Sequence, residues 1–373
     1  MRDFVLTSEA MTAGHPDKLC DQISDAMIDA CLMASPPIGC NAECAVASGI
    51  VFLSIRHGHG LQVDPADLAR RVIREAGYPE SEGPTRTTVM LDLVEAAELV
   101  GPIAPQAMRT NHMTTAFGYA CDQTETRMPW PIWATHQIRE QLEQQIGEPP
   151  FTALTPDAEA QVAVRFTDRR PVALAAVALN VFTADGSEPQ DVLAEQLRTR
   201  VVEPALENAP IGLDATTRFV VRRAPGVGGS RAHAGLTGRK VANDTYGGFV
   251  RQSSSALSGK DPSRIDRIAA YAARQAAVSA VAAGLADECE VQLSYVAGDR
   301  EPISFEVDSF ATGMVPDAEI AAALSRAFDF GIGAIVERLA LWDLPRQNGG
   351  RFYRDIARAT HVGRSDLALP WDQ

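Results

Sequence analysis

This chain of 373 residues has fewer basic than acidic residues. Lys and Arg number 34 against 48 Asp and Glu, which gives a formal net charge of −14 at pH 7. Proteins that bind nucleic acids contact phosphates through a basic face. The composition therefore argues against a nucleic-acid partner, and any site for a polyanion must be a local basic patch in an acidic protein.

Long apolar runs and cysteine pairs are also missing. No apolar stretch approaches the roughly 20 residues that span a bilayer, and the start of the chain lacks the apolar core of a signal peptide. The six cysteines form no C-x-x-C pair, and the C-x3-C spacing of Cys40 and Cys44 has no second half at zinc spacing. We therefore expect a cytoplasmic protein with reduced, mostly buried thiols and no membrane partner.

The remaining composition is that of globular domains, with 46% hydrophobic and 22% charged residues. The length predicts two or three domains. A loop-like segment at 101–115 and a glycine-rich segment at 226–248 separate the parts. We expect domains over residues 1–100, 113–231 and 232–373.

Helical and strand patterns alternate along the chain, which predicts the α+β class. Apolar spacing predicts helices over 16–30, 64–77, 187–207 and 264–285. Apolar and β-branched residues predict strands over 44–55, 161–166, 172–181, 291–297 and 303–307. Asp64 and Asp261 are expected to cap the second and fourth helices. On the first helix, Asp21, Asp25 and Asp29 form the face opposite the apolar one.

The segment Gly14–Lys18 opens the first predicted helix. Helix N-termini bind anions through free N–H groups and the helix dipole, and His15 and Lys18 add donors. Asp17 can hold the Mg²⁺ that accompanies a polyphosphate. Taken alone, the same residues also suit a plain helix cap.

A second segment, Gly235–Lys240, combines glycines with adjacent cations. Glycine lets the backbone approach a ligand closely, Arg239 supplies a fork of donors and Lys240 a point charge for phosphate oxygens. The segment lacks the G-x-x-x-x-G-K-[ST] pattern of a Walker A loop, and alone it also fits a basic turn.

The third segment, Ser258–Pro262, leads through Arg264 into the fourth predicted helix. Lys260 repeats the phosphate-binding chemistry, and Asp266 offers a second carboxylate for a metal ion. One such segment is a weak signal, but three in one acidic chain favour a metal–polyphosphate site.

These segments resemble those of S-adenosylmethionine synthetases (methionine adenosyltransferases). The resemblance begins at Gly14–Lys18 and is strongest in the first 30 residues and over 235–297. Further matching motifs are Asp21–Ala26, Gly235–Lys240, Asp244–Gly248, Ser258–Pro262, Asp266–Arg274, Gly284–Asp287, Ser294-Tyr295, His361–Arg364 and Pro370-Trp371. Because several long motifs follow one another in the correct order, the chain is identified as a divergent member of that family.

The resemblance implies three similar α+β domains around a pseudo-threefold axis, with active sites between the two subunits of a dimer that often pairs into a tetramer. It implies that a sulfur nucleophile attacks C5′ of ATP and that tripolyphosphate leaves and is hydrolysed. Mg²⁺ and K⁺ are the implied cofactors. The implied residues are His15, Lys18, Asp168, Arg239, Lys240, Lys260 and Arg264 for ATP and its phosphates, Arg170 in place of a catalytic lysine, Asp17 and Asp266 for Mg²⁺, and Glu43 for K⁺.

The departures from the family gather at the acceptor end of the implied site. Arg56 stands where the family has a glutamate that helps hold methionine, and His233 stands where it has an aspartate. Three further differences follow. Asn111–Thr114, with His112, replaces the family's G-A-G-D-Q-G motif, and the gating loop is shortened to Gly101–Pro105. Pro225 stands near the position of the aromatic residue that lies against adenine in the family.

A charged hydrogen bond is worth about 1.5–3 kcal/mol. Losing two acidic partners would weaken binding of an ammonium-bearing acceptor roughly 10²–10⁴-fold. The phosphate and metal set is nearly whole, so we predict a Mg²⁺-dependent ATP adenosyltransferase whose small-molecule acceptor is not methionine. The alternatives are ordinary S-adenosylmethionine synthesis, hydrolysis with water as the acceptor, and a non-catalytic regulatory partner of a true synthetase.

Overall fold

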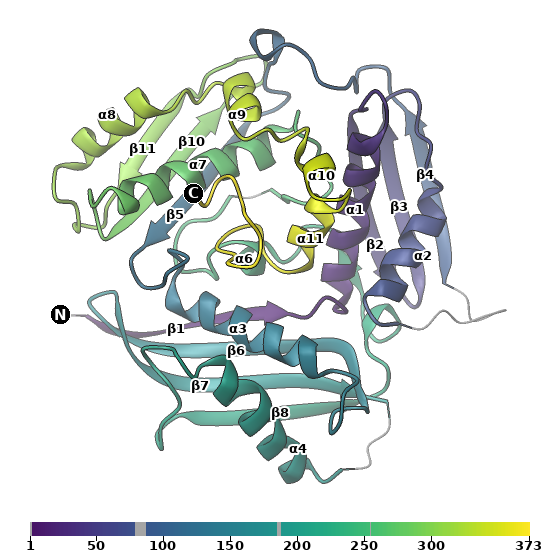
Figure 1. Cartoon of the computed structure of the whole chain (residues 1–373), viewed down its shortest axis with the longest axis vertical. Helices are drawn as coiled ribbons and strands as arrows, with labels where there is room; N and C mark the ends of the chain where they lie inside the picture. Colours follow the sequence, from purple (N-terminus) through teal and green to yellow (C-terminus); the bar gives the residue numbers. More distant parts are fainter. Residues whose placement is uncertain (1, 79–86, 185–187, 254) are drawn as a thin grey trace.

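The computed structural model describes residues 2–78, 87–184, 188–253 and 255–373. It contains three β-sheets, each covered by helices and placed around a common centre, and it has the predicted α+β architecture (Figure 1). The C-terminal segment with α10 (Leu344–Gln347) and α11 (Phe352–Arg358) lies at that centre. Among the described helices, none combines the length and apolar content needed to cross a bilayer.

The sheets have four, three and four strands. One has the order β1-β6-β7-β8, with bounds Asp3–Met11, Leu154–Thr167, Arg170–Thr183 and Arg218–Pro225. A second has the order β11-β10-β5, with bounds Ser304–Asp308, Glu288–Tyr295 and Thr114–Cys121. The third has the order β4-β3-β2-β9, with bounds Thr88–Glu95, Ile50–His57, Cys40–Ala47 and Gly235–Leu236.

Each sheet borrows a strand from a distant part of the sequence. β1 pairs with β6, β5 pairs with β10, and β9 pairs with β2. Every sheet therefore has an edge strand that is held by backbone hydrogen bonds to a segment far away in the sequence.

Five of the described helices are at least eleven residues long. Their bounds are α1 Pro16–Met33, α2 Pro65–Glu75, α3 Trp130–Gln145, α7 Ile265–Ala282 and α8 Asp317–Ala327. Shorter helical segments are α4 Gln190–Leu197, the π-helical turn η3 Arg198–Val202, α5 Glu203–Ala205, α6 Val241–Asp244, α9 Ile332–Arg338, and the 3-10 turns η2 Pro105–Ala107 and η4 Gly229–Arg231.

Several sequence predictions need correction in detail. The single strand expected over 44–55 is a hairpin of β2 and β3, because Ser48 and Gly49 take positive φ angles of 51° and 77° and turn the chain. The helix expected over 187–207 is divided between α4, η3 and α5, and residue 187 lies outside the described residues. Asp64 caps α2 as predicted, but Asp261 does not cap α7, since its carboxylate accepts from Ser263 instead.

The acidic face of α1 is buried rather than solvated. Asp21 and Asp25 have no exposed surface and Asp29 has 2%. Asp25 Oδ1 accepts from Gly259 N at 2.8 Å, and the Asp29 carboxylate accepts from two backbone N–H groups of α11. Burial raises the pKa of Asp25 and of Asp29. This face holds loops from the C-terminal third of the chain against α1.

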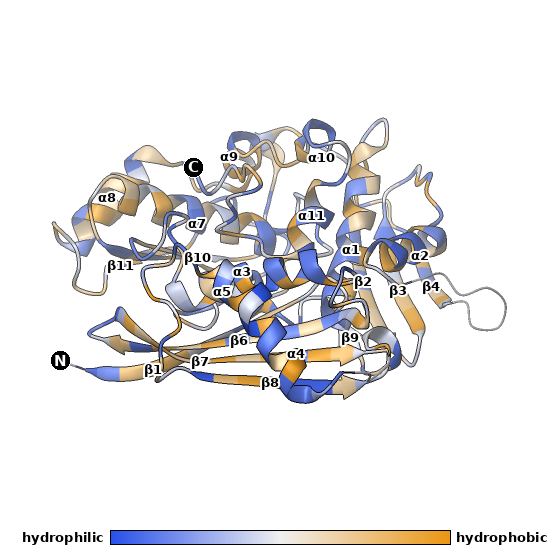
Figure 2. Ribbon diagram, turned by 60° about the horizontal axis from the view of Figure 1, so that its bottom comes forward, coloured by the Kyte–Doolittle hydropathy of each residue, from blue (hydrophilic) through white to orange (hydrophobic). Residues whose placement is uncertain are grey.

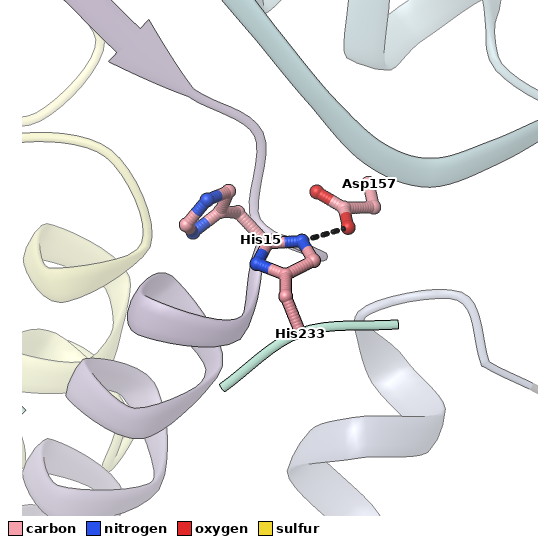
Figure 3. Close-up of side chains that lie close together, drawn as sticks. All are labelled: His15, Asp157 and His233. Atoms are coloured by element: carbon pink, nitrogen blue, oxygen red, sulfur yellow. Dashed lines mark hydrogen bonds and ion pairs between the residues drawn. The ribbon is translucent and has the colours of Figure 1, made fainter. Parts of the chain in front are cut away.

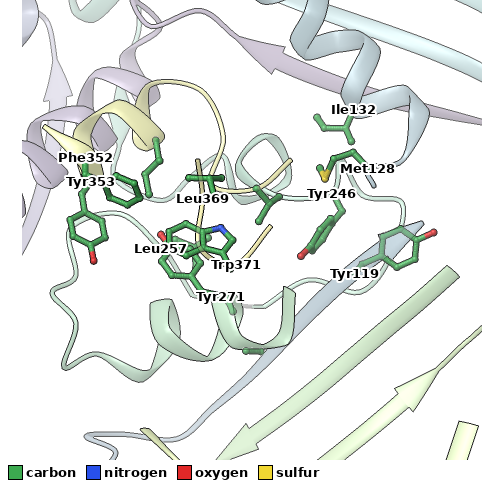
Figure 4. Close-up of a cluster of buried hydrophobic side chains, with 14 of the residues drawn as sticks. Tyr119, Met128, Ile132, Tyr246, Leu257, Tyr271, Phe352, Tyr353, Leu369 and Trp371 are labelled. Carbon is green, nitrogen blue, oxygen red and sulfur yellow. The ribbon is translucent and has the colours of Figure 1, made fainter. Parts of the chain in front are cut away.

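An aromatic core lies between the sheet units (Figure 4). Tyr271 of α7 stacks on Trp371 near the C-terminus, with ring centroids 3.6 Å apart and planes 6° from parallel. The indole N–H of Trp371 donates to the backbone oxygen of His361 at 2.7 Å, which fixes the end of the chain in the centre. All six cysteines are buried and unpaired, as predicted.

Candidate functional site

The N-terminus of α1 positions the first predicted polar segment. His15 is the N-cap, and its Nδ1 accepts from the backbone N–H of Asp17 at 3.2 Å. Pro16 occupies the first turn, where its missing N–H costs nothing. His15 Nε2 lies 3.2 Å from Glu159 Oε1, so both ring nitrogens have partners.

The glycine-rich segment docks directly on this helix start. Leu236 N donates to Asp17 Oδ1 at 2.9 Å, and Gly238 N donates to Asp21 Oδ1 at 2.7 Å. A Cβ at Gly235 would lie 2.3 Å from the backbone carbon of Pro16, so only glycine allows this approach. The structure therefore brings two of the three predicted segments together.

This docking places the predicted cations beside the helix start. Arg239 Nε lies 3.0 Å from Asp17 Oδ1, and the Arg239 side chain is 52% exposed. Lys240 Nζ lies 3.3 Å from Glu9 Oε1 and is close enough to Glu159 to lower the pKa of that carboxyl. Both cations can reach a ligand at the surface.

Lys18 does not face a ligand, contrary to prediction. Its side chain has no exposed surface, and Nζ lies 3.1 Å from Asp21 and 2.5 Å from Asp244. Burial opposes the charge of Lys18, but these two carboxylates outweigh it and raise its pKa. Lys18 belongs to an internal ion network that joins α1 to α6.

Two carboxylates that the sequence interpretation missed complete the first cluster. Asp157 and Glu159 lie on β6, and Asp157 Oδ2 is 2.9 Å from His233 Nε2 (Figure 3). The hydrogen bond from His15 lowers the pKa of Glu159 to about 2, against the effect of burial. Their signal was acidic residues at alternate positions of a strand, just before its apolar part. We call His15, Asp17, Asp157, Glu159, His233, Arg239 and Lys240 the His15 cluster.

A second cluster surrounds Asp266 at the start of α7. Lys260 Nζ lies 2.7 Å from Asp266 Oδ2, and His112 Nε2 lies 2.9 Å from the same carboxylate. Burial would raise the pKa of Asp266, but Lys260 and His112 lower it below its ordinary value. Asp266 therefore stays ionised and available to a cation.

Glu43 and Arg56 lie on the exposed face of the sheet next to Lys260. Glu43 and Lys260 line one hollow of about 450 Å³, together with residues of β3 and β9. Arg56 is opposite Asn41 in the β2–β3 register, and Asn41 forms a β-bridge to Lys260. We call Glu43, Arg56, His112, Lys260 and Asp266 the Lys260 cluster.

Arg264 borders the Lys260 cluster as the N-cap residue of α7. Its backbone N–H donates to the oxygen of Asp261 at 3.1 Å. Within the described ranges its guanidinium has no recorded hydrogen bond or ion pair, and the residue is half-buried. It remains a cation at the edge of the cluster.

Asp168 and Arg170 are not brought to either cluster in the chain. They lie at the β6–β7 turn, where Arg170 pairs with Asp122 at 2.5 Å and Asp287 at 2.6 Å. Glu159, which contacts His15, lies opposite Met11 on β1, whereas Thr167, which adjoins the turn, lies opposite Asp3. Eight residues of β6 separate Glu159 from Thr167, a distance of about 26 Å along the strand. The predicted grouping of Arg170 with His15 is therefore wrong within one chain.

The two clusters are themselves separate in the chain. Asp17 belongs to the first, while Asp25, two helical turns later, holds Gly259 beside Lys260. Eight residues of α-helix rise about 12 Å. Each cluster therefore presents only part of the predicted cation set.

The chemistry of both clusters suits a metal-bound polyphosphate. Guanidinium and ammonium groups bind phosphate oxygens, and carboxylates bind Mg²⁺. Ligand atoms of His15, Asp157 and His233 also lie within 4.8 Å of one another, a spacing found in metal sites. However, both ring nitrogens of His15 already have partners, which favours a hydrogen-bonded cluster over metal ligation.

Comparisons with known proteins agree over the whole chain. Models of the N-terminal, central and C-terminal domains of S-adenosylmethionine synthetase match residues 3–95, 108–224 and 227–373. The S-adenosylmethionine synthase of Prochlorococcus marinus is 39% identical over 398 aligned positions, which cover 100% of this chain and 94% of that protein. The proteins of the same name from Synechococcus elongatus and Trichormus variabilis are 36% and 37% identical, each covering 100% of this chain and 95% of the relative.

Proposed function

Because this chain belongs to the S-adenosylmethionine synthetase family and is an enzyme of the methionine adenosyltransferase type, we propose that it transfers the adenosyl group of ATP to an acceptor other than methionine. A nucleophile on the acceptor attacks C5′ of ATP, and tripolyphosphate leaves in line with the new bond. The positive groups of the two clusters stabilise the charge of this leaving group, which grows in the transition state.

The phosphate-binding roles fall to groups at the surface of each cluster. Arg239 and Lys240 flank His15 at the start of α1, where backbone N–H groups and the helix dipole add to their field. Lys260 and Arg264 supply the same chemistry at the start of α7. All four cations are at least partly exposed, so they can exchange their present partners for phosphate oxygens.

Asp17 and Asp266 are the proposed Mg²⁺ ligands. Both are carboxylates on the first turn of a helix, and hard oxygen donors suit this ion. When bound, Mg²⁺ would neutralise phosphate charge and orient the leaving group. Glu43, an exposed carboxylate at the hollow beside Lys260, is the proposed K⁺ ligand.

The complete site is proposed to form between two chains, with the His15 cluster of one facing the Lys260 cluster of the other. Large apolar side chains are exposed along strands of two sheets, where Figure 2 shows hydrophobic colouring. They are Val5, Phe52, Met90, Leu91, Leu93, Val94, Val172 and Leu236, each at least 37% exposed. Such a surface is typical of a protein–protein interface, and a homodimer or a pair of dimers would cover it.

The altered acceptor is supported by one observation above all. At the two positions that the resemblance assigns to the acceptor's ammonium group, this chain has Arg56 and His233. Arg56 is 52% exposed and, among the residues that the structure describes, pairs with Glu98 alone at 3.3 Å, while His233 is held by Asp157. A cation at the first position repels an ammonium group and attracts a carboxylate or another anion.

Ordinary S-adenosylmethionine synthesis is the second candidate. It is favoured by 39% identity over the full chain to a protein named for that activity. In this case residues other than Arg56 and His233 would hold methionine.

Assays of purified protein with ATP, Mg²⁺ and K⁺ separate the candidates. We expect a methionine kcat/KM at least about 10²-fold below the ordinary range of 10⁴–10⁸ M⁻¹s⁻¹. Release of tripolyphosphate or its hydrolysis products should rise when a small-molecule fraction of cell extract is added. Formation of S-adenosylmethionine at about 1 s⁻¹ would refute the altered acceptor. Absence of ATP cleavage with every fraction would favour a non-catalytic partner.

A further inference from the structure

The imidazole of His233 is held between three neighbours. Its Nε2 lies 2.9 Å from Asp157 Oδ2, its ring stacks on Phe182 at 6.0 Å, and the His15 ring approaches it edge-on at 5.0 Å. In Figure 3 His15 lies on the side of the His233 ring away from Asp157. The side chain remains 34% exposed, so a ligand can reach it.

Asp157 is a fixed partner. It has no exposed surface, and its Oδ2 also accepts from Gly229 N at 2.7 Å. Gly228 and Gly229 have φ angles of 62° and 65°, and a Cβ at Gly228 would lie 2.6 Å from Asp157 Cβ. Two glycines are therefore required to bring the backbone donor against this carboxylate.

The pairing decides which nitrogen of His233 carries the proton. A carboxylate only accepts hydrogen bonds, so the proton lies on Nε2 and is donated to Asp157. Nδ1 then keeps a lone pair, and over the described residues no hydrogen bond to it is recorded. A buried aspartate that orients an imidazole in this way is the arrangement of a general base in enzymes.

His15 cannot take this role as it stands. Its Nδ1 accepts from Asp17 N, and its Nε2 contacts the Glu159 carboxylate. His233 is thus the histidine of the His15 cluster with a free acceptor nitrogen.

We infer that His233 is a general base and that the acceptor carries a proton on its nucleophilic atom, as a thiol, hydroxyl or amine does. This inference rests on the proposed function. The S–H, O–H or N–H proton passes to His233 Nδ1, the freed electron pair bonds to C5′ of ATP, and the C5′–O bonding pair leaves with tripolyphosphate. The thioether of methionine has no proton to give, so a base would be idle in S-adenosylmethionine synthesis.

Thioether and protic acceptors that share one four-carbon skeleton test the inference. L-Methionine and 4-(methylthio)butanoate end in a thioether. By contrast, 4-mercaptobutanoate, 4-hydroxybutanoate and 4-aminobutanoate end in a thiol, a hydroxyl and an amine, and they carry a carboxylate without an α-ammonium group, as Arg56 favours. We expect the wild-type protein to adenosylate at least one of the three protic compounds with a kcat that rises with pH along a single-proton limb. His233→Gln should lower that kcat about 10²–10⁴-fold and abolish the limb, and added imidazole should restore part of the rate.

Asp157→Asn is the matched test of positioning, because it keeps the shape but favours the other tautomer of His233. It should also lower kcat for the protic compound, and in both variants this loss should be several times greater than any loss of turnover with a thioether. Equal losses with protic and thioether acceptors, or an unchanged pH limb in His233→Gln, would overturn the base while leaving the altered acceptor intact. Adenosylation of methionine alone would overturn both.

Discussion

Lys18 and Asp244 form an ion pair of 2.5 Å with no more than 1% of either side chain exposed, and they connect α1 to α6 across 226 positions of sequence. Asp21 completes the network at 3.1 Å from the same ammonium group. Lys18→Met would leave two buried carboxylates without their cation. We expect a loss of about 3–5 kcal/mol in the free energy of unfolding, measured by urea denaturation.

Lys240→Met is the control for this variant, because Lys240 is partly exposed and its ion pair within the described part of the chain is with the half-exposed Glu9. Its unfolding free energy should change by about 1 kcal/mol or less. If Lys18→Met keeps wild-type stability and loses only ATP cleavage, then Lys18 has the phosphate-binding role first predicted.

The two clusters should complement each other between chains. Lys240→Met and Lys260→Met are each expected to lower kcat for ATP cleavage about 10²–10³-fold, since each removes a cation from the leaving group. When both variants are coexpressed, half of the dimers should combine one chain of each kind and regain one intact site. A two-fold symmetric dimer then predicts about a quarter of wild-type activity. Activity no greater than that of the single variants would show that each site lies within one chain.

Arg170→Ala should leave the reaction unchanged. Arg170 pairs with Asp122 and Asp287 at the β6–β7 turn, and its side chain is 46% exposed. Because such ion pairs contribute about 0–1 kcal/mol, we expect a small change in stability and a kcat within twofold of wild type. A fall of 10²-fold or more in phosphate release would return Arg170 to the site.

The Glu159–His15 pair predicts a pH dependence of stability. The hydrogen bond from His15 lowers the pKa of Glu159 to about 2 from its ordinary value of 4.5. A lowered carboxyl pKa stabilises the folded state above the ordinary pKa, and this contribution disappears as pH falls toward the folded-state pKa. Glu159→Gln should therefore be less stable than wild type near neutral pH, with the difference shrinking between pH 4.5 and about 2. A difference that stays constant over this range in urea titrations would contradict the assignment.

Acidic residues at the two acceptor positions should restore activity with methionine. The double variant Arg56→Glu and His233→Asp returns both positions to the acids that the resemblance implies. Each charged contact is worth about 1.5–3 kcal/mol, so kcat/KM for methionine should rise by about 10²-fold or more. Arg56→Gln, which removes the positive charge without adding a negative one, is the control and should gain less. No gain in the double variant would mean that methionine, if used, is held elsewhere.

Local patterns predicted much of the fold. α1, α2 and α7 follow from apolar spacing, and β6 and β7 from β-branched runs around a turn. The interpretation missed β1, β4, β5, β8, α3 and α8, to which it assigned no helix or strand. It also treated the aspartates of α1 as a polar face, because sequence spacing cannot show that distant loops supply N–H donors to them. Their burial is a tertiary effect.

The candidate site was predicted where its residues lie in contiguous motifs. Glycines and cations marked Gly235–Lys240, and the structure places this segment on the start of α1. Asp157 and Glu159 were missed because two acids at alternate positions of a strand are a weak local signal, and their partners His233 and His15 come from distant segments. Lys18 was assigned to phosphates from its neighbours in sequence, whereas the side chain turns inward to Asp21 and Asp244.

The exchange of strands among the three sheets limits how this molecule can be divided. A fragment that ends before Gly235 would lose β9, and one that starts after Met11 would lose β1, leaving β2 and β6 each with one unpaired edge. Such bare edges recruit other chains, so separately produced thirds should precipitate rather than fold. A single domain of this fold therefore cannot be exchanged or fused by itself. A change of substrate specificity has to come from substitutions within the chain, such as those at Arg56 and His233.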